Sequence, residues 1–352
     1  MRSLQVNQVL NHYPPDCQPA QVEALGSAGG MSGAQFWRIT VRGSPEPTQR
    51  MLCLRRWPIE HPSPQRLAFI HAVLQHAAGG GISFIPVPIA SHTGESFVLH
   101  AGYLWQLEPW MRGAADYERT PRVAKLRAAM TALAQFHIAT CDFQPGATTM
   151  GVGRKAEPVP GANQSAIPRR LAQLRALSQS GISDLSRAIS DTIWPELAPL
   201  ARQFIAALPI AAQKAIAKLE PLVDIRLPLQ PCLRDIWHDH ILFIGDEVTG
   251  VIDFGAVDID TPATDIARLL GSLVADDPAG WQTGLAAYSS VRPVSPDESL
   301  AVSAFDTCGP ILAGCNWIRW IYIERRDFEN CQQVIERFRK QLARVANLTT
   351  TR

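Results

Sequence analysis

The sequence predicts an α+β protein with two lobes, a small β-rich lobe at the N-terminus followed by a larger and mostly helical lobe. Runs of strand length gather in the first part of the chain, whereas long stretches with apolar residues at helical spacing fill most of the rest. With 352 residues the chain is also too long for one ordinary core. We therefore expect an N-terminal lobe at 1–110 and a C-terminal lobe at 111–352.

The N-terminal lobe is predicted to be a small sheet with one helix. A glycine-rich turn leads into two strands joined by a Gly/Ser/Pro turn, which is typical of a hairpin. The helix has a Ser-Pro start signal, and three glycines follow its end. In chain order we expect the glycine-rich turn at 24–33, strands at 35–42 and 51–57, the helix at 64–77, strands at 96–99 and 103–107, and a hinge at 108–113.

The C-terminal lobe is predicted to be helical apart from one hairpin. Leu126, Met130, Leu133 and Phe136 lie on one side of its first helix. Two apolar runs separated by Gly-Asp-Glu indicate the hairpin. In chain order we expect a helix at 122–140, a loop at 148–164, helices at 166–178 and 186–218, hairpin strands at 241–244 and 248–252, and helices at 262–275, 280–289, 296–325 and 328–348.

Composition and charge exclude several classes of partner. The net charge of +1 favours small-molecule ligands over a nucleic acid or an anionic membrane surface. The N-terminus has no apolar run long enough for a signal peptide, and polar residues and a proline interrupt the most apolar stretch, 301–323. The seven cysteines include no CxxC pair, which favours reduced thiols in the core. We expect a cytoplasmic protein without a membrane span.

Two carboxylates flank the predicted hairpin. Asp235 lies in a short loop before it and Asp253 follows it in Asp-Phe-Gly, so the hairpin would hold both at one end of a small sheet. One such carboxylate can hold a metal ion while the other accepts a proton, which is what phosphoryl transfer from ATP requires. The alternative is that both are turn residues that cap a hairpin. The downstream sequence Pro262-Ala263-Thr264-Asp265 favours the chemical interpretation.

The glycine-rich segment GSAGGMSG, residues 26–33, precedes a strand and not a helix. It therefore fits neither the dinucleotide-binding fingerprint nor the Walker loop, both of which lead into a helix. Glycine lets the backbone approach a phosphate closely, and the Ser32 hydroxyl can donate a hydrogen bond to a phosphate oxygen. For the segment taken alone, a plain flexible turn is the alternative.

The order of these features resembles the aminoglycoside phosphotransferase and choline kinase branch of the protein-kinase-like fold. The resemblance covers nearly the whole chain. Its specific part lies within residues 233–267, where LRDIWHDH, VTGVIDFG and TPATDIA are similar to the family's H-G-D-x-x-x-x-N, V-x-G-V-I-D-F-G/E and D-P-x-x-D-L-A. It implies a bilobal kinase-like fold and ATP-dependent transfer of the γ-phosphoryl group to a hydroxyl or amine of a small metabolite or aminoglycoside-like acceptor.

The same resemblance implies roles for individual residues. Asp235 matches the family's catalytic aspartate, which acts as the base, and Asp253 matches the aspartate that holds the metal. His240 stands at the position of the second metal ligand, and Asp265 matches a buried aspartate that braces the catalytic loop. The implied cofactors are ATP and Mg²⁺, with Mn²⁺ as an alternative. The residues implied to bind the nucleotide are Gly29, Gly30, Ser32, Gly33, Arg55 and Glu108.

Departures from the family pattern leave a second interpretation open. His240 replaces an asparagine, and because imidazole suits magnesium less well than an amide oxygen, His240 is also a candidate structural histidine. Leu233 and Arg234 replace the loop's histidine and glycine, and the helix at 64–77 has no glutamate to pair with Arg55. A catalytically weak or inactive kinase-like protein that binds a nucleotide or a protein partner is therefore the alternative to an enzyme.

Further choices remain open from the sequence. Arg56 competes with Arg55 for the nucleotide, since neighbouring strand side chains face opposite ways. Trp317 and Trp320 could form an aromatic wall for a cationic amine or belong to the core. Neither the acceptor nor the oligomeric state is determined by any motif.

Overall fold

The computed structural model describes residues 2–27, 33–43, 50–145, 166–328 and 330–350. The chain forms two compact units. The first unit contains Met1–Pro160 and His238–Asp258, and the second contains Gly161–Trp237 and Ile259–Arg352. The segment with the predicted hairpin therefore packs with the N-terminal part of the chain, although it lies between the two halves of the second unit in sequence.

The first unit is built on a five-stranded antiparallel sheet in the order β1-β2-β3-β5-β4. All but β1 overlap strands expected from the sequence. No element is predicted at 19–23, and the turn predicted from residue 24 begins too early, because the strand continues to Gly26. The strands are β1 (Pro19–Gly26), β2 (Gln35–Val41), β3 (Met51–Arg56), β4 (Val98–His100) and β5 (Tyr103–Pro109).

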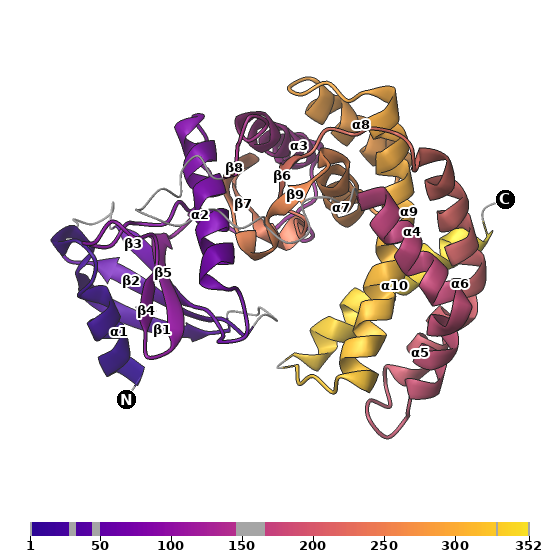
Figure 1. The fold of residues 1–352 in the computed structure, drawn as a ribbon, viewed down its shortest axis with the longest axis horizontal. Coiled ribbons are helices and arrows are strands. Elements are labelled where there is room, and N and C mark those ends of the chain that lie inside the picture. Colours follow the sequence, from indigo (N-terminus) through magenta and orange to yellow (C-terminus); the bar gives the residue numbers. More distant parts are fainter. Residues whose placement is uncertain (1, 28–32, 44–49, 146–165, 329, 351–352) are drawn as a thin grey trace. The chain divides into compact units, whose positions relative to one another are not determined.

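The two faces of this sheet differ in polarity. One face, which includes Trp37, Leu54 and Trp105, joins the hydrophobic core beneath the N-terminal helix α1 (Arg2–Leu10), which lies along the sheet in Figure 1. Side chains alternate along each strand, so Arg55 and its cross-strand partner Gln106 lie on the opposite face. The sheet thus has one apolar face and one face that carries polar groups.

Two helices and a hairpin complete the first unit. The helix α2 (Pro64–Gly79) begins as predicted, because Ser63 Oγ accepts a hydrogen bond from the backbone N–H of Arg66 at 3.2 Å. The helix α3 (Val123–Ala139) also matches its predicted range closely. β7 (Ile241–Ile244) and β8 (Glu247–Val251) form the predicted hairpin.

The second unit is mainly helical, and α6, α7, α9 and α10 pack against one another (Figure 1). Two short strands, β6 (Gln230–Cys232) and β9 (Asp258–Asp260), pair in a separate small sheet. Neither strand is predicted from the sequence, because three residues are too few to show a period. The helices are α4 (Ala166–Ala176), α5 (Ile182–Ala188), α6 (Ala198–Leu219), α7 (Pro262–Val274), α8 (Pro278–Ser289), α9 (Pro296–Ile318) and α10 (Cys331–Thr350).

The predicted single helix at 186–218 is wrong, because α5 ends at Ala188 and α6 begins at Ala198. Pro195 lies in the break, and a proline disfavours the helical conformation of the residue before it. The π-helical turn Leu177–Gly181 also extends α4 toward α5. The predicted loop at 148–164 lies outside the described residues.

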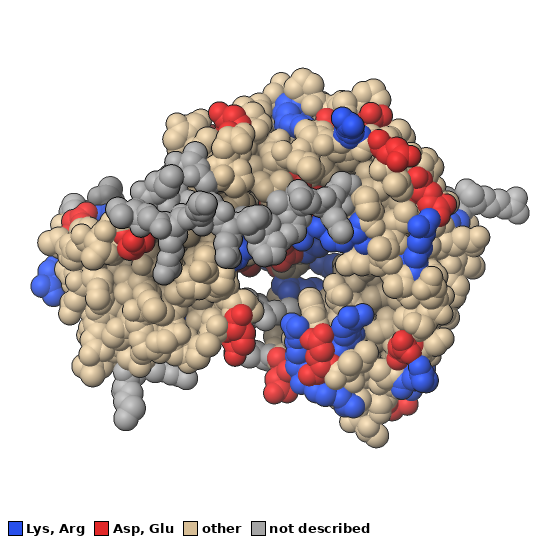
Figure 2. All heavy atoms as spheres, viewed as in Figure 1, with Lys and Arg blue, Asp and Glu red and all other residues tan. Residues whose placement is uncertain are grey.

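The surface and the thiols agree with the composition. Lys and Arg side chains are interspersed with Asp and Glu on the face shown in Figure 2. No helix in the described part of the chain has the length and apolarity that a membrane crossing requires. All seven cysteines are free thiols, and burial raises the pKa of Cys308 and Cys315 to about 12. These buried thiols are therefore protonated at neutral pH.

Candidate functional site

Arg55 is a buried cation on the polar face of the sheet. It is 5% exposed, and its guanidinium Nη2 lies 3.4 Å from Oδ1 of Asp253. The guanidinium carbon lies 3.5 Å from the ring centre of Trp57 and 5.0 Å from that of Phe36, so aromatic rings partly shield the charge. Within the described residues the buried Nε has no hydrogen-bond partner. An anionic group bound here would supply the missing acceptor.

The structure decides between the two neighbouring arginines. Arg56 lies on the opposite face of β3, where its guanidinium carbon is 4.4 Å from the ring centre of Tyr103 and 5.7 Å from that of Trp105. Because side chains alternate along a strand, the two arginines cannot point to the same site. Arg55 is the one that accompanies Asp253.

Asp253 connects β8 to a short 3₁₀ turn and has a left-handed backbone, with φ 63° and ψ 67°. Its Oδ2 lies 3.7 Å from Nε2 of His240, so Arg55 and His240 flank the carboxylate. Burial raises the pKa of Asp253, but the charges of Arg55 and His240 and the hydrogen bonds to the carboxylate lower this pKa by more. The carboxylate is therefore ionised at neutral pH. A left-handed non-glycine residue at a charged site is a common mark of function.

The two residues after Asp253 anchor it. Phe254 is buried and packs on Phe136 of α3, with ring centres 5.9 Å apart. A Cβ added at Gly255 would lie 3.2 Å from Cη2 of Trp57, so glycine permits the close passage of the chain beside that ring. The sequence Asp-Phe-Gly thus combines one ionised carboxylate with two packing residues.

No glutamate of α2 pairs with Arg55, since α2 has no acidic residue. Instead His71 of α2 joins a neutral network: its Nε2 lies 3.1 Å from Oε1 of Gln106, and its Nδ1 lies 2.8 Å from Oγ of Ser96. Trp57 Nε1 donates to the same Gln106 oxygen at 2.7 Å. Burial lowers the pKa of His71 to about 4, so the ring is neutral at pH 7. Asp253 is the carboxylate that forms an ion pair with Arg55.

Glu108, predicted to bind the nucleotide, lies near the end of β5. Its carboxylate accepts a hydrogen bond from Nε2 of Gln106. Burial raises the pKa of Glu108 to about 7; Arg55 and Gln106 oppose this rise, and Asp253 adds to it. Two carboxylates, Asp253 and Glu108, therefore share the field of Arg55, and one of them is partly protonated near neutral pH.

The predicted glycine-rich segment connects β1 to β2. Gly29, Gly30 and Ser32 lie outside the described residues. Gly33 is described and has φ +75°, a conformation that glycine adopts with little strain. The placement of Gly33 just before β2 agrees with the predicted order of turn and strand.

Asp235 belongs to the second unit and lies in the loop after β6. A guanidinium N–H of Arg268 in α7 donates to Oδ1 of Asp235, and both side chains are about half exposed. The buried Asp265 accepts hydrogen bonds from the backbone N–H groups of Leu233 at 2.6 Å and Arg234 at 2.7 Å. Asp265 therefore braces this loop, as the sequence analysis expects.

Arg268 is absent from the residues predicted for the site. It follows Asp265 by three positions, and residues at this spacing lie on one face of a helix. That spacing was the available signal, since a helix that braces the loop with Asp265 presents Arg268 on the same side. Arg234 has φ 62°, so the loop keeps the left-handed backbone that its glycine position in the family pattern favours.

His238 and Trp317 also have partners in the structure. His238 lies 2.9 Å from Glu118 and 3.0 Å from Asp239, so it is paired with acidic side chains of the first unit. Trp317 is 7% exposed and packs edge-on against Trp320, with ring centres 5.2 Å apart. Trp317 is therefore part of the core of the second unit.

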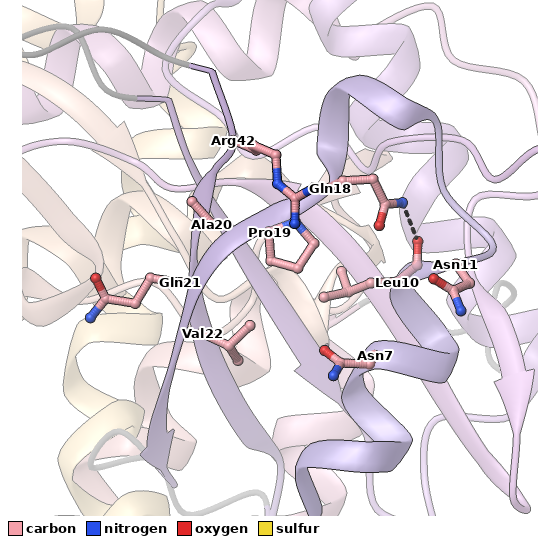
Figure 3. Close-up of a pocket in the computed structure, with 9 residues that line it drawn as sticks. All are labelled: Asn7, Leu10, Asn11, Gln18, Pro19, Ala20, Gln21, Val22 and Arg42. Carbon is pink, nitrogen blue, oxygen red and sulfur yellow. Dashed lines mark hydrogen bonds between the residues drawn. The ribbon is translucent and has the colours of Figure 1, made fainter.

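Two cavities lie away from these residues. One of about 420 Å³ is bounded by α1, β1 and the turn between them, where Gln18 Nε2 donates to the carbonyl of Leu10 at 3.2 Å (Figure 3). The other, of about 490 Å³, lies beside α4 and is lined by Leu171 and Arg175 among others. No predicted site residue lines either cavity.

Comparison with solved structures identifies the fold. A spectinomycin phosphotransferase in complex with ADP and spectinomycin matches with a TM-score of 0.65 and 12% identity, covering 99% of this chain and 98% of the other. An amicoumacin kinase in complex with AMP-PNP and Ca²⁺ matches with a TM-score of 0.64 and 13% identity, covering 99% and 93%. These similarities confirm the predicted α+β kinase-like fold.

Sequence comparison is more specific. The homoserine kinase of Methylobacterium nodulans is 26% identical over 278 residues, which is 78% of this chain and 73% of that protein. The homoserine kinase of Brucella anthropi is 26% identical over 269 residues, covering 75% and 69%. Residues 24–298, most of the chain, match the sequence pattern of the phosphotransferase enzyme family. Together with the fold, this match shows that the chain belongs to the phosphotransferase enzyme family and is a kinase-like phosphotransferase.

Proposed function

We propose that the protein transfers the γ-phosphoryl group of ATP to a hydroxyl or amine of a small acceptor. The observation that supports this most is the group formed by Arg55, Asp253 and His240, in which an aromatic-shielded cation and an ionised carboxylate meet. Membership of the family supplies the reaction class. The division into a nucleotide-binding lobe at 1–110 and a catalytic and substrate-binding lobe at 111–352 is part of the same proposal.

Arg55 is proposed to grip the phosphates of ATP. A guanidinium presents several N–H groups in a plane, which suits phosphate oxygens. The Nε of Arg55 is buried and has no hydrogen-bond partner within the described residues. Gly29, Gly30, Ser32 and Gly33 are proposed to cover the phosphates. Glu108 is proposed to contact the nucleotide from the end of β5. Relatives of known structure bind ADP or AMP-PNP, which supports ATP as the donor.

Asp253 and His240 are proposed to hold a divalent cation. The donor set fits such an ion, because a half-exposed ionised carboxylate and an imidazole nitrogen lie 3.7 Å apart. When bound, the ion neutralises phosphate charge during transfer. Mg²⁺ is the first candidate, and the imidazole makes Mn²⁺ a second one. Since Asp253 is ionised at neutral pH, no proton must leave it before the metal binds.

Asp235 is proposed to accept the proton of the acceptor. As the acceptor oxygen bonds to the γ-phosphorus, the bond from that phosphorus to the bridging oxygen breaks and ADP leaves, while the hydroxyl proton passes to Asp235. Arg268 holds the Asp235 carboxylate in its present direction. L-Homoserine is the first acceptor to test, because the chain is similar to homoserine kinases.

The test is the thermal unfolding midpoint with ATP or GTP, each with Mg²⁺, Mn²⁺ or no metal. A ligand that binds only the folded protein raises this midpoint, because it stabilises the folded state. At one hundred times its Kd the stabilisation is about 2.7 kcal/mol. We expect a metal-dependent shift that Asp253→Asn removes. Asp246→Asn is the matched control, since Asp246 lies in the turn of the same hairpin and pairs with Arg122 at 3.4 Å.

Turnover completes the test. Asp235→Asn should keep the nucleotide-dependent shift and lose about 100-fold or more in transfer. If no nucleotide with any metal shifts the midpoint of the unaltered protein, the proposal fails and the inactive kinase-like alternative is favoured. If Asp253→Asn keeps the full shift, Asp253 does not hold the metal.

A further inference from the structure

Two arginines of the second unit pair with one buried carboxylate, and a third arginine experiences its charge. The Asp260 side chain is 2% exposed, and its Oδ2 lies 2.8 Å from Nη2 of Arg169 and 3.7 Å from Nε of Arg234. Its Oδ1 accepts a hydrogen bond from the backbone N–H of Thr261 at 2.8 Å. The side chains of Arg169 and Arg234 are 31% and 32% exposed, so both guanidinium groups are reached by solvent.

The third arginine adds positive charge to this cluster. Arg170 packs over Phe305, with its guanidinium carbon 4.1 Å from the ring centre, and its Nη1 lies 3.4 Å from Oγ1 of Thr264. Burial lowers the pKa of Arg170; Asp260 raises this pKa, and the charges of Arg169 and Arg234 lower it. The arginines therefore repel one another, and Asp260 offsets this repulsion in part.

Two other arginines of this unit each pair with one carboxylate. Arg175 on the same helix as Arg169 pairs with Glu220 at 2.8 Å, and Arg202 pairs with Asp191 at 2.7 Å, one cation to one anion. Asp260, by contrast, is shared by two arginines, Arg169 and Arg234. Both guanidinium groups are partly exposed, and such groups bind planar carboxylates well.

We propose that Arg169 and Arg234 form a subsite for a carboxylate group of the acceptor. Asp260 is a positioning residue, because its carboxylate pairs with both guanidinium groups. Arg234 directly precedes Asp235 in the chain, so the proposed subsite and the proposed base share the loop after β6. This inference rests on the proposed function and narrows it to hydroxy acids or amino acids with a hydroxyl group.

The test compares acids with the same molecules lacking the carboxylate. The pairs are L-homoserine with 3-aminopropan-1-ol, L-serine with ethanolamine, and 4-hydroxybutyrate with propan-1-ol. ATP-dependent phosphorylation and the thermal unfolding midpoint are measured for each compound, and the midpoint is also measured with inorganic phosphate. The variants are Arg169→Gln, Arg169→Lys and Arg234→Gly, with Arg175→Gln as the matched control on the same helix.

We expect the unaltered protein to prefer the acids. Arg169→Gln and Arg234→Gly should each raise the KM of a preferred acid by about tenfold or more, and Arg175→Gln should not. Arg169→Lys keeps a charge for Asp260 but loses the planar fork, so it should fold normally and lose part of the preference. The decarboxylated compounds should respond far less to these changes than the acids do.

The two readouts separate this inference from the proposed function. Equal turnover of acids and their decarboxylated partners would overturn the subsite and leave the phosphotransferase function intact. A rise in midpoint specific to acids and lost in Arg169→Gln, without any turnover, would support the subsite and contradict the proposed function. A midpoint that responds to inorganic phosphate alone, or to no compound, would overturn the subsite.

Discussion

The pKa of Glu108 allows a quantitative test of the environment of Arg55. Burial raises this pKa from 4.5 to about 7, so the folded protein binds more protons at Glu108 than the unfolded chain does between these values. Stability that depends on this proton is complete below pH 4.5 and is lost as the pH rises through about 7. Above that pH the ionised carboxylate destabilises the fold.

Glu108→Gln should therefore stabilise the protein at pH 8 and change little at pH 4.5. The rise in pKa corresponds to at most about 3 kcal/mol, and because Glu108 is partly exposed we expect about 1–2 kcal/mol. Glutamine keeps the shape of the side chain and an oxygen that can accept from Gln106. The gain in stability of Glu108→Gln should develop between pH 5 and pH 7. A carboxylate whose pKa is lowered by folding has the opposite pH dependence, because its stabilising effect grows as the pH rises.

The assay is urea denaturation at several pH values between 5 and 8, followed by tryptophan fluorescence. The free energies of unfolding of Glu108→Gln and of the unaltered protein are compared at each pH. Glu23→Gln serves as control, because Glu23 is a strand carboxylate paired with Arg38 at the surface and about half exposed. A difference between Glu108→Gln and the unaltered protein that stays constant from pH 5 to pH 8 would refute the reasoning.

Other predictions concern single positions in the two units. Gly314→Ala should destabilise the second unit by about 1–3 kcal/mol, because the new Cβ would lie 2.1 Å from Cζ of Phe204. Gly309→Ala in the same helix meets open space and should stabilise this unit by about 0.5–1 kcal/mol. Urea denaturation of both variants measures these changes, and similar free energies of unfolding for the two would contradict the prediction. Arg234→Gly should be about 1 kcal/mol more stable than Arg234→Ala, because φ is 62° and both variants lack the guanidinium; a more stable alanine variant would show that the left-handed backbone is not retained. His240→Asn should preserve or raise turnover with Mg²⁺ relative to Mn²⁺ if His240 is a metal ligand, and a loss of folding measured by circular dichroism would instead support a structural histidine.

Much of the fold follows from local patterns in the sequence. Helices such as α2 and α3 carry apolar residues at helical spacing with start signals, and these patterns act within a few residues of one another. The hairpin β7–β8 follows from two apolar runs around a turn. The order of motifs, with Asp-Phe-Gly after the hairpin, is enough to predict the family. The prediction of one helix at 186–218 was wrong, because apolar periodicity continues across a break that includes Pro195.

The partners of the site residues depend on long-range geometry. Strand register and alternation decided that Arg55 and not Arg56 meets Asp253, and packing of α2 placed His71 on Gln106 where the kinase pattern has a carboxylate. Arg169 meets Asp260 although the two lie far apart in the chain. Such contacts depend on how distant segments approach, and periodicity within one segment carries no information about that approach. The sequence by itself thus determined the fold class and most elements and predicted the two aspartates as site residues, whereas tertiary structure decided which charges face one another.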